Sequence, residues 1–452
     1  MTPLAYLAMF GIMPLGIAFF GWMTPRKAAA LTLFGAWLFL PMATIPISGF
    51  LDFNKMMAAC STVIVGVLLF DAKRVAKLQF HWVDLPIIAY CLWPGVCSVA
   101  NGNGVWDGLS IVAQYLATWG GPYLVGRMYF SDADGIRYLA RAFYLAGIAY
   151  MPFCLYEVRM SPQLHSMFYG FHQHSFAQTF RMGGWRPMVF MQHGLMVSLF
   201  MVLTTVIGIW LWRRKELPLL FGFSTKYFLP LMVLTTVLSR STGALALGVV
   251  AISALFVAKH FGPKIVILPL LLIAPFWVSG RLSGVFSGEI VSQTAVAITG
   301  DANRGGSMNA RLAQEDKVRG SVLSSPVFGY GRWGKGLDQL WLLEARNHGI
   351  PQVVSLILVC SLPSLLALIK MSKKQMNTAG GFAVLLAFLP LLFLLDSLVN
   401  GMVNPLYVLA AGASTYCLYD LKAVERTTES KHASIPKMHF KVVRDLHPGH
   451  SL

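Results

Sequence analysis

The chain has 452 residues, of which 56% are hydrophobic and only 12% are charged, and its mean hydropathy is +0.62. Soluble domains carry about twice this share of charged residues, so the composition excludes an ordinary soluble protein and indicates an integral membrane protein. The net charge of +17 would also suit a nucleic-acid-binding protein, but the basic residues are distributed according to the apolar segments, so we predict no nucleic-acid partner.

Apolar runs of roughly membrane-spanning length follow one another along the chain, separated by short polar turns. They predict a bundle of helices, because an open sheet would leave backbone groups unpaired in lipid. We therefore expect residues 1–420 to form one all-α, polytopic membrane domain with about 12–14 transmembrane helices. The 13 candidate helices span 4–22, 28–46, 56–70, 85–100, 108–126, 140–156, 194–212, 226–239, 243–258, 265–280, 350–369, 381–396 and 404–420.

The basic residues predict the orientation of this bundle. When the short loops are assigned alternately to the two sides, one side receives 17 lysines and arginines and the other receives only Lys55 and Arg240. Positive loops stay in the cytoplasm, so the first side is predicted to be cytoplasmic, together with the basic tail 421–452. The 17 residues are Arg26, Lys27, Lys73, Arg74, Lys77, Arg127, Arg137, Arg141, Arg213, Arg214, Lys215, Lys226, Lys259, Lys264, Lys370, Lys373 and Lys374.

Two segments, 157–193 and 281–349, are too long and too polar to be simple turns, and this topology places both on the outer side. In the second, NARLAQEDKVRGS (309–321) predicts a short amphipathic helix that ends at Gly320, followed by the Pro- and Gly-rich stretch SSPVFGYGRWGKG. Function is expected where these two large outer loops meet.

Three arginines stand beside predicted helix ends on that outer side. Arg181 and Arg186 lie in RMGGWRPMVFMQHG (181–194), just before a long apolar run, and Arg240 lies in the tight turn SRSTG (239–243). A guanidinium near hydrocarbon is costly unless it snorkels, pairs or lines a wet cavity, and its planar fork matches phosphate oxygens. The three could bind a lipid diphosphate; alternatively, each snorkels or pairs with a carboxylate such as Glu157.

These segments resemble a known family. LTTVLSRSTGALALG (234–248), RMGGWRP before a helix, NARLAQEDKVRGSVLSSPVFGYGRWG (309–334) and DQLWLLEARNHG (338–349) are similar, in order and spacing, to segments of the O-antigen ligase and polysaccharide polymerase superfamily. The resemblance covers roughly residues 180–370. It implies a fold similar to that of C-class polytopic glycosyltransferases, in the bacterial inner membrane with the active side in the periplasm.

The implied reaction transfers a glycan from an undecaprenyl (polyprenyl) diphosphate donor to a hydroxyl, with inversion. Ligases of this family read His-Asn-x-x-Leu before the helix that follows the outer loop, whereas this chain has Asp338, Gln339 and Leu342 there. The missing histidine favours a polymerase of O-antigen or exopolysaccharide, whose acceptor is another lipid-linked glycan, over a ligase acting on lipid A-core. Membrane lipids and envelope polysaccharide assembly proteins are the other implied partners.

In this reading Arg186 and Arg240 are catalytic, because they would stabilise the charge that grows on the departing diphosphate. Asp338 is the first candidate to accept the proton of the acceptor hydroxyl, although it could be a turn or capping residue and the departing phosphate could accept the proton itself. The substrate-binding candidates are Arg181, His193, Arg311, Arg319, Arg332, Glu344 and His348.

No cofactor or metal is predicted. His165, His172 and His174 could suggest a metal site, but neither a cysteine nor a carboxylate completes a set nearby, and the surrounding aromatic residues are typical of a membrane interface. A secondary transporter or flippase of lipid-linked glycans is the main rival, for which Asp396 could couple protons; alternatively, Asp396 is a helix-end residue at the outer surface that bonds to Asn400 or Arg240. A non-catalytic scaffold is a third reading.

Overall fold

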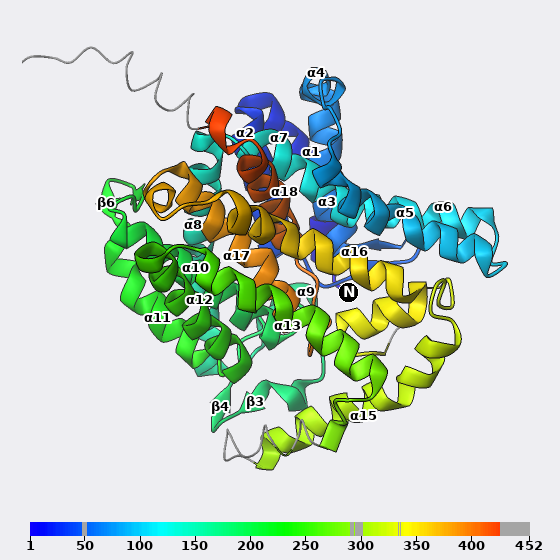
Figure 1. Ribbon diagram of the computed structural model, residues 1–452. Helices are drawn as coiled ribbons and strands as arrows, with labels where there is room; N and C mark the ends of the chain where they lie inside the picture. The colour runs from blue at the N-terminus through cyan, green and yellow to red at the C-terminus, as the bar shows by residue number, and fades with distance from the viewer. Residues whose placement is uncertain (48–51, 290–292, 294–301, 333, 335, 425–452) are drawn as a thin grey trace, which may run out of the picture.

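The computed structural model describes residues 1–47, 52–289, 293, 302–332, 334 and 336–424, and Figure 1 traces the chain through them. Residues 425–452, most of the predicted basic tail, lie outside this description. The fold is helical, with three hairpins of two-residue strands: β1–β2 (Thr44–Ile45 and Phe53–Asn54), β3–β4 (Phe180–Arg181 and Gly184–Trp185) and β5–β6 (Leu219–Leu220 and Phe223–Ser224).

The longer helices follow the chain from end to end. They are α1 (Pro3–Trp22), α2 (Pro25–Phe39), α3 (Lys55–Phe70), α5 (Leu85–Ala100), α6 (Val105–Tyr115), α7 (Gly121–Phe130), α8 (Ala133–Met160), α10 (Gly194–Arg213), α11 (Leu229–Leu238), α12 (Thr242–Phe261), α13 (Lys264–Ser283), α15 (Ala302–Ser324), α16 (Leu340–Lys370), α17 (Ala379–Ser397) and α18 (Pro405–Tyr419). Two short helices are α4 (Ala72–Ala76) and α9 (Leu164–Tyr169).

Eight helices in the described part of the chain are long and apolar enough to cross a membrane. They contain α1, α5, α8, α10, α12, α13, α16 and α17. The chain is therefore a multi-pass helical membrane protein. The expected number of 12–14 spans exceeds these eight because several predicted helices are short or interrupted: α2 and α18 each have 15 residues, and the run 108–126 is broken by a π-helical turn at Leu116–Gly120.

The two ends of the bundle differ in charge. The helices α10, α12 and α16 all end near the basic residues Arg213, Lys259 and Lys370, and we call this the basic end. At the opposite end, α10 and α12 begin and α17 ends. We call this the cavity end, because a large cavity lies there. Figure 1 shows α4, with Lys73 and Arg74, at the top of the bundle and the β3–β4 hairpin and α15 at the bottom.

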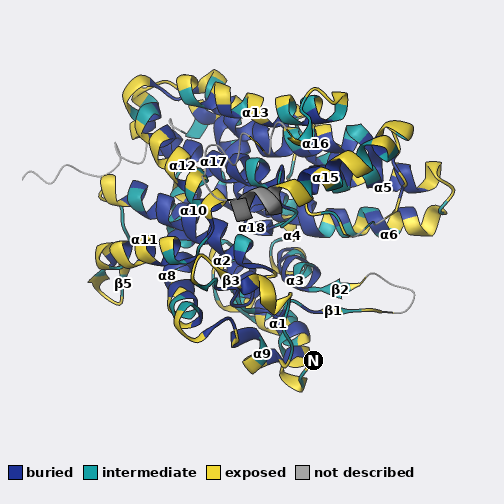
Figure 2. Cartoon of the chain, turned by 90° about the horizontal axis from the view of Figure 1, so that it is seen from below, coloured by how far each residue is buried: buried dark blue, intermediate teal, exposed yellow. Residues whose placement is uncertain are grey.

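Two helices form the centre of the bundle. α10 and α17 are apolar on all sides, and nearly every residue of each is buried by other helices rather than left to lipid. Figure 2 shows this buried interior and the exposed outer faces of α11 and of α5 and α6, which lie side by side at the edge. The cavity end is thus built on a rigid central pair.

One predicted bound was wrong: the helix expected to end at Gly320 continues as α15 to Ser324, just before Pro326, which cannot extend it. The helix expected from residue 350 is present and begins after a break at Gly349, whose φ is +79°. The preceding block is also helical from Leu340 onward, so α16 includes both helices. A side chain at Gly349 would meet the carbonyl oxygens of Val327 and Pro326, so the break lets the chain after α15 approach α16.

The contact between α7 and α18 predicts a measurable loss of stability. A Cβ added to Gly412 would lie 2.0 Å from the Tyr123 carbonyl oxygen, so Gly412→Ala must push the two backbones apart. We expect this overpacking to cost about 1–3 kcal/mol and to lower the thermal midpoint in detergent, read out by labelling of the buried cysteines.

Gly11→Ala is the matched control, because nothing lies within 4 Å of a Cβ added at this position in α1. It should leave the midpoint unchanged or raise it slightly, since alanine favours a helix over glycine. Equal losses in both variants would contradict the close packing of α7 and α18.

Candidate functional site

A cavity of about 1160 Å³ lies at the cavity end of the bundle. Five segments distant in sequence line it: the loop 174–195 with the β3–β4 hairpin, the α11–α12 turn with the start of α12, one turn of α15, residues 337–338, and the end of α17 with residues 399–402. Both large predicted loops therefore contribute to one cavity. Its walls combine basic side chains with apolar ones such as Leu247 and Val250 of α12.

Four arginines line this cavity: Arg181, Arg186, Arg240 and Arg311. Among the described residues, no carboxylate lies within ion-pair distance of Arg181, Arg186 or Arg240, and Arg311 is 4.0 Å from the Asp338 carboxylate. Burial, together with repulsion from Arg181 and Arg311, lowers the pKa of Arg186 to about 10, so its guanidinium stays charged at neutral pH. Because Arg181, Arg186 and Arg240 have no ion-pair partner in the described part of the chain, this side of the cavity attracts anions.

Arg240 occupies a strained turn. Its φ is +54°, a left-handed value that is uncommon outside glycine, and its Nη1 donates hydrogen bonds to the carbonyl oxygens of Met182 and Arg181. Its Nε is buried without a hydrogen-bond partner among the described residues. The predicted partner of Arg240 is therefore the backbone of the β3–β4 hairpin and not a carboxylate.

The glycines of RMGGWRPMVFMQHG make room for the arginines. A Cβ on Gly184 would lie 2.2 Å from Nη2 of Arg240, and a Cβ on Gly194 would lie 2.3 Å from Cδ of Arg186. Arg186 in turn donates through Nη2 to the carbonyl oxygen of Arg240 at 2.8 Å. The hairpin and the α11–α12 turn thus brace each other, and both guanidinium groups are fixed at the cavity wall.

Glu157 does not neutralise these arginines. Its carboxylate accepts hydrogen bonds from the backbone N–H groups of Leu164, Met188 and Val189, at 3.0, 2.8 and 2.7 Å. Glu157 therefore stabilises the conformation of the loop between α8 and α10. The alternative in which Glu157 pairs with an arginine is not what the structure contains.

His193 forms the start of α10 and also lines the cavity. Its Nδ1 accepts from the backbone N–H of Leu195, which leaves the proton on Nε2, 3.3 Å from Oε1 of Gln178. The His174 ring lies edge-on at 4.8 Å. Burial lowers the pKa of His193 to about 3, with repulsion from His174 and the arginines adding to the effect, so the ring is neutral at physiological pH.

Two carboxylates stand on the cavity wall. Asp338 is well exposed, with a side chain 65% accessible, and its backbone N–H donates to Oε1 of Gln314 at 3.1 Å. Asp396, at the end of α17, accepts from Nδ2 of Asn400 at 2.9 Å, while Oδ1 of Asn400 is buried without a partner in the described region. The cavity therefore holds cations and two carboxylates together.

Arg311 reaches this cavity because α15 is clamped to α13. Arg281, buried at the end of α13, donates to the Glu315 carboxylate, to Oδ1 of Asp316 at 2.9 Å and to the Leu312 carbonyl oxygen at 3.0 Å. Arg319 strengthens the same contact by donating to the Leu282 carbonyl oxygen at 2.8 Å. Arg319 is not among the cavity-lining residues, so the structure does not bring it together with Arg186 and Arg240.

Arg332 is also outside the cavity wall. Its Nε donates to Oδ1 of Asn103 at 2.5 Å, and Nδ2 of Asn103 donates to the Gly331 carbonyl oxygen at 3.0 Å. The Gly-rich stretch after α15 is therefore docked onto the α5–α6 tip. Gly331, with φ of +62°, leaves space for the Cys97 carbonyl oxygen at that contact.

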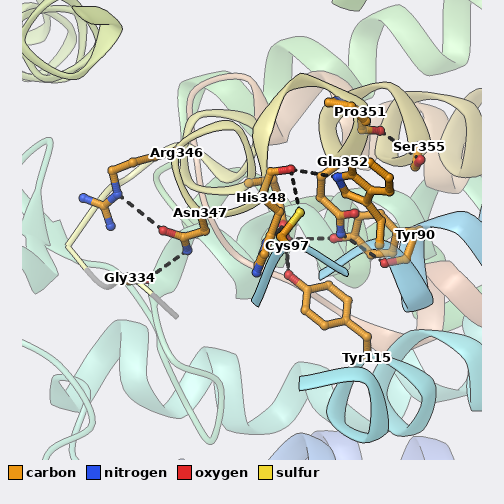
Figure 3. Close-up of polar contacts among 12 residues, drawn as sticks. Tyr90, Cys97, Tyr115, Gly334, Arg346, Asn347, His348, Pro351, Gln352 and Ser355 are labelled. Carbon is orange, nitrogen blue, oxygen red and sulfur yellow. Dashed lines mark hydrogen bonds and ion pairs between the residues drawn. The ribbon is translucent and has the colours of Figure 1, made fainter. Parts of the chain in front are cut away.

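Glu344 and His348 belong to a separate buried network between α5, α6 and α16. The hydroxyls of Tyr90 and Tyr115 donate to the Glu344 carboxylate at 2.9 and 2.8 Å, and Nδ1 of His348 lies 3.2 Å from it. Figure 3 shows His348 here, its carbonyl oxygen accepting from Trp93 and Cys97. Neither residue lines the cavity, because the first turns of α16 face α5 instead.

The histidines of the 164–174 segment are held by backbone groups. His165 accepts from the Met42 N–H at Nε2 and donates through Nδ1 to the Phe171 carbonyl oxygen, and His172 contacts the carbonyl oxygens of His174 and Pro162. No group of three potential metal ligands occurs among the residues that the structure describes.

Sequence reasoning did not assign His174, Gln178 or Asn400 to the site, and it placed Asp396 under a transporter reading. The alternative for Asp396, a helix-end residue that bonds to Asn400, is confirmed by the hydrogen bond between the two side chains, which stand four residues apart in FLLDSLVNGMVNP. Comparison of the chain with protein-family models, curated proteins and solved structures finds no match.

The lowered pKa of His193 predicts a pH-dependent stability. An unfolded histidine binds a proton near pH 6.5, whereas folded His193 binds it only near pH 3, so stability should fall as pH decreases between these values, by about 1.4 kcal/mol per pH unit at most. His165, whose pKa burial lowers to about 4, also destabilises the folded protein as the pH falls.

His193→Asn keeps a good helix cap and removes the titrating ring. We expect its thermal midpoint to rise progressively relative to that of the wild type as the pH falls from 7 to 4.5. His165, which lowers stability over this range, and Glu315, whose raised pKa of about 7 increases it, act alike in both proteins. Parallel midpoint curves for the two proteins would contradict the burial of a neutral imidazole at position 193.

Proposed function

We propose that this protein is a membrane glycosyltransferase that joins a glycan carried on a polyprenyl diphosphate to a hydroxyl acceptor, as a polysaccharide polymerase. One observation carries the proposal: Arg181 and Arg186 of the 174–195 loop and Arg240 of the α11–α12 turn line one cavity with no carboxylate within ion-pair distance among the described residues. A cluster of this kind needs an anion, and a diphosphate supplies the required charge and oxygen geometry.

The cavity has a surface for the diphosphate and another for the polyprenyl chain of a lipid-linked donor. The arginines would hold the diphosphate, with the Nε–H groups of Arg186 and Arg240 unpaired in the described structure. Ala246, Leu247 and Val250 of α12 continue the same wall away from the arginines and would contact the first apolar units of the polyprenyl chain. Placing the basic loops in the cytoplasm would put this cavity on the outer, periplasmic side.

The chemistry needs a leaving group and a proton acceptor. In the proposed step the acceptor oxygen forms a bond to C1 of the donor sugar while the bond from C1 to the diphosphate oxygen breaks. The arginines stabilise the negative charge that grows on the departing diphosphate, more strongly where water is excluded. The proton of the acceptor hydroxyl goes to a carboxylate on the wall, with Asp338 as the proposed base beside Arg311.

A polymerase is favoured over a ligase by the residue at position 338. The resemblance described above would place a histidine there in a lipid A-core ligase, and this chain has an exposed aspartate. A lipid-linked acceptor would bring its hydroxyl to Asp338 on the cavity wall.

Reconstitution tests the proposal directly. The purified protein in vesicles is given a polyprenyl diphosphate-linked glycan, and the products are separated by chain length. We expect longer lipid-linked glycans and release of polyprenyl diphosphate. Movement of the glycan across the bilayer without a new glycosidic bond would instead support a transporter and overturn the proposed function.

Arg240, in the α11–α12 turn, provides a prediction for a single residue. Arg240→Lys keeps the charge but loses the planar fork, so we expect the transfer rate to fall on the order of 10²–10³-fold while the protein still inserts and folds. Arg332→Lys is the control, because Arg332 is exposed and lies outside the cavity wall. Wild-type activity of Arg240→Lys would remove this residue from the site.

The two carboxylates can be separated by experiment. If Asp338 accepts the proton, Asp338→Asn should lower the maximal rate with little change in donor binding, measured by protection against thermal unfolding. Asp396→Asn should retain more activity. The reverse order of the two rates would assign the proton to Asp396, which Asn400 already orients.

A further inference from the structure

A second site lies at the basic end of the bundle, far from the arginine cavity along α10 and α12. A small cavity of about 40 Å³ opens between these two helices. Its lining is apolar toward the bundle centre and basic toward the helix ends. The lining residues are Val206, Ile209, Trp210, Arg213, Arg214, Ile252, Leu255, Phe256 and Lys259.

Two cations at this site have no counterion among the residues that the structure describes. Arg214 is occupied, since it donates to the carbonyl oxygens of Met376 and Asn377 and lies 3.8 Å from the Glu216 carboxylate. Arg213 and Lys259, in contrast, have no carboxylate within ion-pair distance in the described part of the chain. Arg213 instead lies over the ring of Phe256, at 5.2 Å. Two uncompensated cations therefore flank one groove.

Trp210 supplies an independent sign of a missing ligand. Its side chain lines the groove and only 5% of the residue is exposed, yet its indole Nε1–H is buried with no hydrogen-bond acceptor among the described residues. A buried donor without an acceptor is costly, because burial removes the water that would otherwise bind to it. An oxygen atom of a bound molecule would satisfy it.

We infer that this groove binds an anionic phospholipid, with its phosphate at Arg213 and Lys259, a phosphate or ester oxygen on the Trp210 N–H, and an acyl chain along α10 and α12. The apolar lining favours a lipid over free phosphate: Ile252 and Phe256 are 40% and 48% exposed and would be covered by the chain. The enclosed volume is small, so only headgroup atoms enter it and the chain lies along the open groove.

The chain following α10 also suits a headgroup layer at this end. The β5–β6 hairpin holds out three apolar side chains, Leu219, Phe221 and Phe223, with exposed fractions of 68%, 92% and 74%. Such side chains next to basic residues are typical of segments that enter the interface between lipid and water. This lipid site is independent of the proposed glycosyltransferase activity.

Lipid-dependent stability tests the inference. The full chain is purified in neutral detergent, and its thermal midpoint is measured during titration with phosphatidylglycerol or phosphatidylcholine. We expect phosphatidylglycerol to raise the midpoint saturably and phosphatidylcholine to have little effect. The variants Arg213→Gln, Lys259→Gln and Trp210→Phe should each weaken this response about tenfold in apparent affinity, as expected for loss of a charge-assisted hydrogen bond.

Matched controls separate the groove from general charge effects. Trp212→Phe removes an indole N–H from a side chain that is 55% exposed and lies outside the groove, and Lys226→Gln removes a charge at the same end. Both controls should respond like the wild type. Equal losses in the controls would overturn the site, and so would equal protection by inorganic phosphate, which would indicate a free anion instead of a lipid.

Arg213 is exposed and Lys259 half-exposed, so their substitutions should not prevent folding even if Trp210→Phe does. A normal phosphatidylglycerol response in both cation variants would also overturn the inference. A protein that binds the lipid but transfers no glycan would leave this site intact and remove only the proposed function.

Discussion

The structure depends on how a bundle of apolar helices accommodates guanidinium groups at one end. A charged group near hydrocarbon requires partners, and here backbone carbonyl oxygens supply them: Arg240 donates to the β3–β4 hairpin and Arg186 donates to the Arg240 carbonyl. These bonds fix position without cancelling charge. The result is a preorganised cationic wall, which is the arrangement that electrostatic stabilisation of a growing negative charge requires.

The elements that hold this wall are more rigid than the loops that complete it. α10 and α17 are buried along almost their whole length, so the starts of α10 and α12 and the end of α17 have defined positions. α15 is held differently, by the buried contact of Arg281 with Glu315 and by the docking of the following Gly-rich stretch onto α5 and α16. Arg311 and Asp338 are therefore presented by a clamped segment beside a rigid frame.

Cationic side chains lie at both ends of the bundle, but in different surroundings. At the cavity end the unpaired arginines are gathered inside a large cavity, whereas at the basic end most cations face outward and Arg213 and Lys259 flank a narrow groove. The same residue types thus suit different anions. Of these two sites, the first has space for a glycan, and the second admits headgroup atoms alone.

The sequence alone determined the membrane class, the helical fold, and the identity of the arginine-bearing segments, because hydropathy and the cost of a charge near lipid act locally along the chain. It could not determine which side chains meet. Arg319, Arg332, Glu344 and His348 occur in the same segments as cavity residues, yet helix rotation and docking turn them to α13, to the α5–α6 tip and to a buried network. Only packing between distant helices brought Asp396 and Asn400 to Arg311, since side-chain direction is decided by the neighbours that each helix face must cover.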